Sequence, residues 1–239
     1  MRPVGERPVP RDVRAAPVPG LPSRGWRVQL PGGATFVAGG RSDGDYAEVP
    51  AGAGYTWLRQ VHGARVVVVD AAGQGQGEEA DAAVTATSGA PLVVRTADCV
   101  PIGLASPQGV VAVAHAGWRG LLAGVVEACV GTMRRLGAQE VSAAVGPYVH
   151  PHAYEFSEAD LGAVAARLGG GVRARTVDGS PALDLGAAVR AALGGCGAEL
   201  VAVCPTCTHC SDEHWSWRAR RDSGRQASVV WVGEQPARG

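Results

Sequence analysis

Short runs of β-branched residues alternate along the chain with longer stretches rich in alanine and leucine. The short runs predict buried β-strands at Arg65–Asp70, Pro91–Arg95, Val110–Ala114, Val141–Val145, Leu200–Val203 and Ser228–Val232. The longer stretches predict helices at Leu121–Leu136, Glu158–Leu168 and Leu183–Leu193. Ser157 is placed to cap the second helix, and Gly137 follows the first. This alternation predicts an α/β fold, a single layered domain with a mixed β-sheet flanked by helices.

The start of the chain lacks this pattern. Proline recurs every few positions in residues 1–25, and little apolar surface is available there to offset the entropy lost on ordering. Residues 1–25 are therefore predicted to be a disordered leader. The remaining residues, 26–239, are enough for one sizeable core and are predicted to form a single catalytic domain.

Composition and charge exclude several classes of function. The 22 basic and 22 acidic residues balance, so no basic excess favours binding to nucleic acid. No apolar run approaches the roughly 20 residues that span a bilayer, so no membrane partner is expected. Lysine is absent, which excludes Schiff-base chemistry. The six cysteines show no regular disulfide framework and the start lacks the apolar stretch of a secretory signal, so a cytoplasmic location is predicted.

Polar clusters stand at the borders of the predicted strands and carry the candidate chemistry. Three of them contain His62, Cys99 and His115. Ligands of α/β sheets collect beyond strand ends, so these side chains are expected to converge. Two imidazoles and a thiolate suit zinc and leave a fourth tetrahedral position open for water or substrate. The alternative is that Cys99 is a small buried residue and the two histidines are satisfied polar groups.

Arginines and one carboxylate surround these candidate ligands. Arg119 lies between two glycines at the predicted start of a helix, where a phosphate could dock. Arg59 with Gln60, and Arg95, flank the other two clusters and are expected to bind substrate, although arginines on a solvated rim would look the same. Asp98 could act as an acid or base, or orient a histidine ligand, and the second role is preferred.

A further group of cysteines and histidines follows the predicted strand at Leu200–Val203. Its members are Cys204, Cys207, His209, Cys210 and His214. They resemble a compact metal-binding knuckle, but only one CxxC pair is present and no second pair lies at the usual distance. Free thiols in a loop are the preferred interpretation.

An ordered series of motifs resembles a known family. The sequence contains QVHGARVVVVD, DAAVT, TADC and AHAGWRG. Further matches are Gly146-Pro147 with Tyr154-Glu155, Cys207-Thr208, and Ser216 with Arg218 through Gly224-Arg225. Over about residues 35 to 232 it is similar to the laccase-domain family of purine nucleoside phosphorylases, also known as polyphenol oxidases and peptidoglycan editing factors.

The resemblance implies a ligand set, activities and a fold. Its metal ligands fall on His62, Cys99 and His115, with zinc as the expected ion and copper as the alternative. It implies phosphorolysis of adenosine, inosine and methylthioadenosine to a base and ribose 1-phosphate, together with deamination of adenosine. Purine nucleoside and phosphate are the implied partners. The fold is expected to be similar to that of cysteine hydrolases of the cytotoxic-necrotizing-factor type.

This chain departs from the family at two places. The segment between Asp45 and Tyr55 is short where relatives carry a helix near the pocket, which leaves substrate preference open. The second arginine of the C-terminal pattern is replaced by Ala219, so Arg218 and Arg225 are the candidates to close over the site.

The sequence is also compatible with other functions. Cys99 could be a nucleophile activated by a histidine in a hydrolase, a deamidase or an enzyme that edits a peptidoglycan precursor. Copper-dependent phenol oxidation would require several copper ions where three ligands offer one site. A binding module that retains only the scaffold is the remaining alternative.

Overall fold

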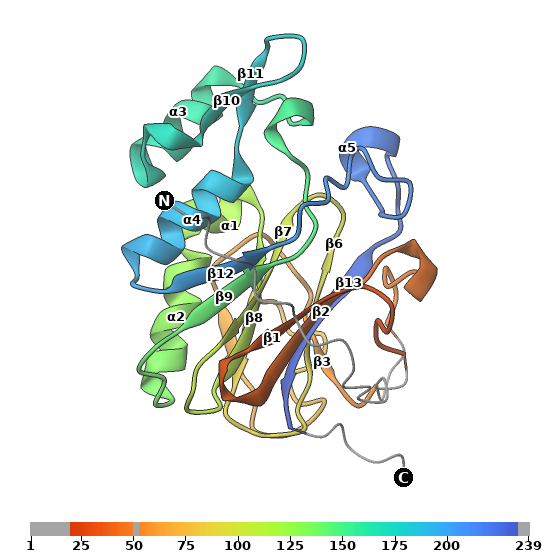
Figure 1. Cartoon of the computed structure of the whole chain (residues 1–239), viewed down its shortest axis with the longest axis vertical. Coiled ribbons are helices and arrows are strands. Elements are labelled where there is room, and N and C mark those ends of the chain that lie inside the picture. Colours follow the sequence, from red (N-terminus) through yellow and green to blue (C-terminus); the bar gives the residue numbers. More distant parts are fainter. Residues whose placement is uncertain (1–19, 50–52, 234–239) are drawn as a thin grey trace, which may run out of the picture.

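Two mixed β-sheets packed face to face form the centre of the protein, with helices against the outer face of one of them (Figure 1). The computed structural model describes residues 20–49 and 53–233. The five-stranded sheet has the order β1-β2-β13-β6-β3, and the six-stranded sheet has the order β12-β9-β7-β8-β5-β4. Most neighbouring strands are antiparallel; β3 with β6, β9 with β12 and β4 with β5 are parallel.

The strands of the two sheets are mostly short. In the five-stranded sheet they are β1 (Trp26–Leu30), β2 (Ala34–Ala38), β13 (Gln226–Val232), β6 (Leu92–Thr96) and β3 (Thr56–Trp57). In the six-stranded sheet they are β12 (Glu199–Val203), β9 (Ser142–Val145), β7 (Val100–Ala105), β8 (Val111–Ala116), β5 (Ala82–Thr85) and β4 (Val66–Val68). A separate hairpin pairs β10 (Arg173–Arg175) with β11 (Pro181–Leu183).

The helices occupy one side of the six-stranded sheet, except for a short helix near the C-terminal end. They are α1 (Trp118–Ala123), α2 (Val125–Arg135), α3 (Glu158–Leu168), α4 (Leu185–Gly195) and α5 (Trp217–Arg220). Four 3₁₀ turns are η1 (Pro31–Gly33), η2 (Arg41–Asp43), η3 (Pro151–Ala153) and η4 (Gly170–Val172). No described helix has both the length and the apolar character needed to cross a membrane.

Apolar packing holds the layers together. Leu121 and Met133 of the helices pack on the six-stranded sheet in the largest core, while Phe36 and Leu92 belong to a second core between the two sheets. The sheets approach closely at Gly103, where an added Cβ would lie 2.3 Å from the ring of Phe36. A side chain at this position would force the sheets apart, because packed interiors leave no room for it.

The mixed α/β class predicted from the sequence is confirmed, with two mixed sheets where one was expected. Each of the six predicted strands overlaps a strand of the structure, and α3 begins as predicted, with the Ser157 hydroxyl accepting a hydrogen bond from the Asp160 amide at 3.1 Å. The single helix predicted over 121–136 is wrong, because Gly124, with φ of 87°, ends α1 and separates it from α2. Strand β7 was not predicted, because Pro101 and Gly103 are residues typical of turns.

The predicted leader falls largely outside the described residues, since residues 1–19 are not described. Residues 20–25, which the prediction assigned to the leader, contribute to the fold. Leu21 is buried, and Asp43 accepts hydrogen bonds from the backbone amides of Ser23 at 2.9 Å and Arg24 at 3.2 Å. These contacts fix this segment beside η2 because they satisfy its backbone donors.

Candidate metal centre

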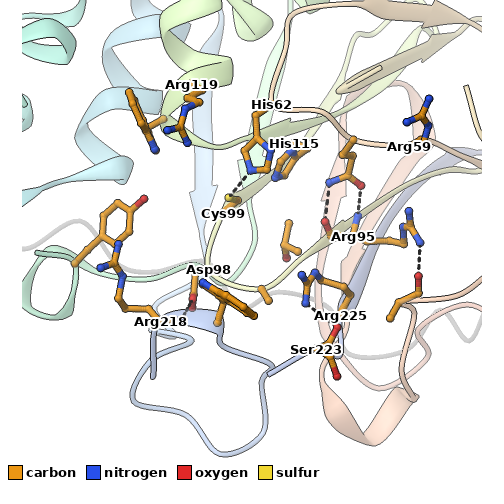
Figure 2. Close-up of a pocket in the computed structure, with 17 residues that line it drawn as sticks. Arg59, His62, Arg95, Asp98, Cys99, His115, Arg119, Arg218, Ser223 and Arg225 are labelled. Carbon is orange, nitrogen blue, oxygen red and sulfur yellow. Dashed lines mark hydrogen bonds between the residues drawn. The ribbon is translucent and has the colours of Figure 1, made fainter. Parts of the chain in front are cut away.

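His62, Cys99 and His115, here called the metal triad, converge where the two sheets meet. Each offers one donor atom within 4.8 Å of the others. Figure 2 shows the three side chains pointing toward one another, with Cys99 Sγ 3.8 Å from His62 Nε2. Typical zinc–nitrogen and zinc–sulfur bonds place two tetrahedral ligands about 3.6 Å apart. The donor set and its spacing therefore fit a single metal ion.

Short connections between strands bring these donors together. Cys99 lies in a three-residue crossing from β6 of one sheet to β7 of the other, and His115 lies in β8 beside β7. His62 has a positive φ of 60°, an uncommon conformation for a residue with a side chain. Gly117 leaves room for the metal triad, because an added Cβ would lie 2.7 Å from His62 Cδ2 and 3.1 Å from Cys99 Sγ.

Asp81 is the carboxylate that holds the metal triad in place. It is fully buried, and its Oδ1 lies 2.8 Å from His115 Nδ1. It also accepts hydrogen bonds from the backbone amides of Val61 at 3.1 Å, His62 at 3.0 Å and Gly63 at 2.7 Å. A proton on His115 Nδ1 leaves Nε2 free to bind a metal, and the amide contacts fix the loop that carries His62.

The charges of these groups depend on one another. Burial opposes ionisation of Cys99, but His115 and His62 outweigh it and lower the pKa of the thiol to about 6. Burial likewise opposes protonation of His115, but Cys99 and Asp81 raise the pKa of the imidazole to about 9. Without a metal, Cys99 and His115 therefore form a thiolate–imidazolium pair at neutral pH.

The expected role of Asp98 as the carboxylate that orients a histidine is wrong, because its carboxylate faces the C-terminal segment. Oδ1 accepts hydrogen bonds from the hydroxyls of Thr208 and Ser216, both at 2.7 Å. Oδ2 accepts the backbone amide of Arg218 at 2.6 Å. With three donors already bound, Asp98 positions the segment that carries Arg218. Its backbone has a φ of 90°, an uncommon conformation for a residue with a side chain, within the crossing between the sheets.

A cavity of about 710 Å³ opens above the metal triad and collects the predicted arginines. Arg119 stacks on Trp118, with its Cζ 4.2 Å from the ring centroid, and Arg218 stacks on Tyr154 at 4.8 Å. Neither guanidinium forms an ion pair with a described residue. Both charges are therefore directed at the cavity with donors available to an anionic ligand (Figure 2).

The other predicted substrate-binding residues line the same cavity but are engaged with the protein. Arg95 donates to the carbonyls of Tyr46, Ala47 and Leu58. The Gln60 amide bonds to the backbone of Arg95 through both its oxygen, at 2.8 Å, and its nitrogen, at 2.7 Å.

Two further arginines are similarly occupied. Arg225 Nη1 donates to three consecutive carbonyls, at 222–224. Arg59 lies at the edge of the site (Figure 2). It forms a 2.5 Å ion pair with Glu79. The main role of these three arginines, Arg59, Arg95 and Arg225, is therefore to form the wall of the cavity. Their guanidinium groups are largely engaged by protein acceptors.

The C-terminal cysteine group is arranged differently from the knuckle suggested by the sequence. Cys207 and Cys210 lie together with His152, which the sequence gave no reason to include. The imidazole of His214 instead lies 2.9 Å from the Ser211 hydroxyl. All six cysteines of the chain are free.

Asp81 was also missed by the sequence reasoning, although it begins the DAAVT motif. Its carboxylate directly precedes a buried strand, which could have marked it as a site residue, but nothing in the sequence linked it to His115. Trp118 of the cavity wall stands in the AHAGWRG motif and Trp217 stands between Ser216 and Arg218, but the sequence did not assign either residue to the site.

Comparisons with known proteins agree with this architecture. The family model described as "Multi-copper polyphenol oxidoreductase laccase" matches residues 44–233. A purine nucleoside phosphorylase of Streptomyces coelicolor is 46% identical over 180 residues, which cover 74% of each chain. One of Streptomyces griseus is 42% identical over 181 residues, 74% of this chain and 73% of its own. The crystal structure of a Neisseria meningitidis protein of the DUF152 family has a TM-score of 0.72 and 26% identity, and the match covers 86% of this chain and 96% of that one. The motifs around the metal triad thus identified the family correctly, and the chain belongs to this laccase-like family.

Proposed function

We propose that this protein is a zinc-dependent purine nucleoside phosphorylase that also deaminates adenosine. The observation that carries the proposal is a triad of potential metal ligands at the floor of a cavity whose wall carries two arginines, Arg119 and Arg218, that form no ion pair with a described residue. Relatives at 42–46% identity are named purine nucleoside phosphorylase, which supports the same reaction here. Adenosine, inosine and methylthioadenosine are the proposed substrates, and the free thiols of the chain favour a cytoplasmic location.

The donor set favours zinc over copper. Two imidazoles and a thiolate bind zinc with a fourth position open, and a bound zinc ion would supply Lewis-acid polarisation of a substrate oxygen or of water. Copper sites with the same donors usually add a weak axial methionine. Met133, the methionine of the described chain, is buried in the core with α2. Phenol oxidation would further require several coppers close together.

Phosphate is proposed to bind to Arg119 and Arg218. In phosphorolysis a phosphate oxygen forms a bond to C1′ of the ribose while the bond from C1′ to the purine nitrogen breaks, and the base leaves with the electron pair. The two guanidinium groups would hold the phosphate dianion and orient one oxygen toward C1′. Stacking on Trp118 and Tyr154 restricts both side chains, so little entropy is lost when phosphate binds.

The purine is proposed to lie against the aromatic part of the wall. Trp217 is 48% exposed and lines the cavity, so its indole can stack on the base. Burial and the nearby Cys99 raise the pKa of Tyr154 to about 12, so its hydroxyl stays protonated at neutral pH. This hydroxyl can therefore donate a hydrogen bond to the nucleoside without carrying charge.

Product analysis of the zinc-loaded protein tests the proposal. Adenosine is incubated with and without phosphate, and products are identified by mass. We expect adenine and ribose 1-phosphate only with phosphate, and inosine with ammonia in both conditions. Cys99→Ala should abolish both reactions, and Cys196→Ala, which removes a thiol elsewhere, should retain them. Adenosine that survives unchanged with the zinc-loaded protein, in the presence and in the absence of phosphate, would overturn the nucleoside assignment.

A cysteine hydrolase is the second candidate, because Cys99, His115 and Asp81 also form a nucleophile–base–carboxylate series. A metal-bound thiolate is a poor nucleophile, so the two functions respond to metal removal in opposite ways. Chelation should abolish activity of the zinc enzyme. Activity that rises on chelation, together with rapid alkylation of Cys99 in the loaded protein, would favour the hydrolase, with peptidoglycan precursors as the next substrates to test.

A further inference from the structure

A second group of metal-binding side chains lies outside the cavity of the metal triad. His152, Cys207 and Cys210 each place one donor atom within 4.8 Å of the other two. We propose that these three residues form a second metal site, which binds Zn²⁺ and fastens the segment between β12 and α5 to the η3 turn. The three residues do not line the cavity, so this ion would have a structural role of its own.

The chemistry of these donors selects a thiophilic ion. Two thiolates and an imidazole match structural zinc sites, whereas Mg²⁺ and Ca²⁺ require oxygen ligands that this group does not supply. His152 Nε2 lies 3.1 Å from Cys210 Sγ, close to the roughly 3.6 Å between two ligands of a tetrahedral zinc ion. His209 Nδ1 lies 3.9 Å from the same sulfur but does not belong to the converging group, so the proposed site has three protein ligands.

The surrounding backbone fixes Cys207 for this role. Cys207 pairs with Tyr148 in an isolated β-bridge, and the amide of Thr208 donates to the Tyr148 carbonyl at 3.0 Å. The amide of His150 donates to Cys207 Sγ at 3.3 Å, and a hydrogen bond to sulfur favours the thiolate form that binds metals. Cys210 is exposed, which gives an ion a path into the site.

The segment that the ion would hold is fastened by hydrogen bonds from other parts of the chain and not by regular secondary structure. Residues 204–216 contain no helix or strand, and only four of them are buried. A metal bridge from His152 to Cys210 joins positions 58 residues apart, so it would remove much of the freedom of this segment. Thr208 and Ser216 within the segment bind Asp98, and Arg218 follows directly. The second site would therefore stabilise the same segment that brings Arg218 to the cavity.

Metal content of the full-length protein, purified under reducing conditions and loaded with excess zinc, tests this inference. We expect about two zinc ions per chain after desalting, and about one in either Cys210→Ser or Cys99→Ser. His152→Gln should resemble Cys210→Ser, and Cys196→Ser should keep both ions. A wild-type protein and a Cys210→Ser variant with equal zinc content would overturn the second site. This readout does not depend on catalysis, so it is independent of the nucleoside proposal.

Cobalt substitution gives a second measurement that does not depend on a variant of the second site folding normally. Thiolate-to-cobalt absorption grows with the number of sulfur ligands, of which the second site has two and the metal triad one. Cys99→Ser should therefore retain about two thirds of the wild-type intensity. Complete loss of the absorption in Cys99→Ser, or a Cys207–Cys210 disulfide in protein kept under reducing conditions, would contradict the proposal.

Discussion

Replacing Asp81 with asparagine tests how strongly one buried carboxylate organises the metal triad. Oδ1 serves the His62 amide and His115 Nδ1, and Oδ2 serves the amides of Val61 and Gly63. Asparagine has one oxygen and one NH₂ group, so two of these four donors would face another donor. Each buried donor left without a partner costs about 1–3 kcal/mol, so the free energy of unfolding should fall by about 2–6 kcal/mol.

The same substitution should weaken metal binding. Loss of the carboxylate that orients a ligating histidine typically lowers metal affinity about 10- to 100-fold. Zinc affinity is measured by competition with a chromophoric chelator, and stability by urea unfolding of the metal-free protein. Leu104→Ala is the control, because it creates a cavity in the core and costs about 2–5 kcal/mol without touching the triad. Zinc affinity within about twofold of wild type in Asp81→Asn would refute this reasoning.

Three further predictions concern the cavity and its surroundings. Arg218→Ala should lower kcat/KM for phosphate about 10- to 100-fold in steady-state assays, because a charged hydrogen bond is lost, whereas Arg59→Ala should change it little. An equal loss in both variants would argue against Arg218 as a phosphate ligand. For Asp222, burial opposes ionisation, but a backbone amide and two arginines lower the pKa below its usual value. The resulting stability is present above pH ~4 and is lost as pH falls through the folded-state pKa. Asp222→Asn should thus cost about 1–2 kcal/mol at pH ~7, and this cost should shrink as pH falls below ~4, as followed by urea unfolding; a cost independent of pH would contradict the assigned cause. Gly117→Ala should reduce zinc binding at least ~10-fold, because its Cβ would lie 2.7 Å from a triad imidazole. Gly131→Ala, whose Cβ would make only an ordinary 3.7 Å contact with Arg135 Nη1, should bind zinc normally. Equal zinc affinity in these two glycine variants would refute the steric argument.

The metal triad could be predicted because each of its members stands at a strand border in a distinctive motif. His62, Cys99 and His115 are far apart in the sequence, yet strand ends that meet at one edge bring them together. The number of sheets could not be predicted in the same way. β6 and β7 are separated by three residues and look like neighbours, but the crossing at Asp98 places them in different sheets.

The roles of polar residues around the triad were less accessible from the sequence. Asp98 adjoins Cys99 and was therefore the natural partner for a histidine, but the crossing turns its carboxylate toward Ser216. Asp81 takes the role because it directly precedes β5, which pairs with β8, the strand that carries His115. Asp98 has a positive φ, and at such a residue the direction of the side chain does not follow from the position of its neighbour in the sequence. The sequence analysis did not include His152 in the cysteine group, because it is 58 positions from Cys210 and approaches it only in the folded chain.

Two buried carboxylates thus position different parts of the site. Asp81 fixes the loop that carries His62 and the imidazole of His115, while Asp98 fixes the segment that leads to Arg218. The residues of the metal triad lie in or near strands of the two sheets. Arg218 instead follows a segment, residues 204–216, in which few residues are buried. The proposed metal site and the proposed anion site are therefore separable in this fold. Damage to the C-terminal segment should weaken the anion site and leave the triad assembled, because the hydrogen bonds of Asp81 do not involve that segment.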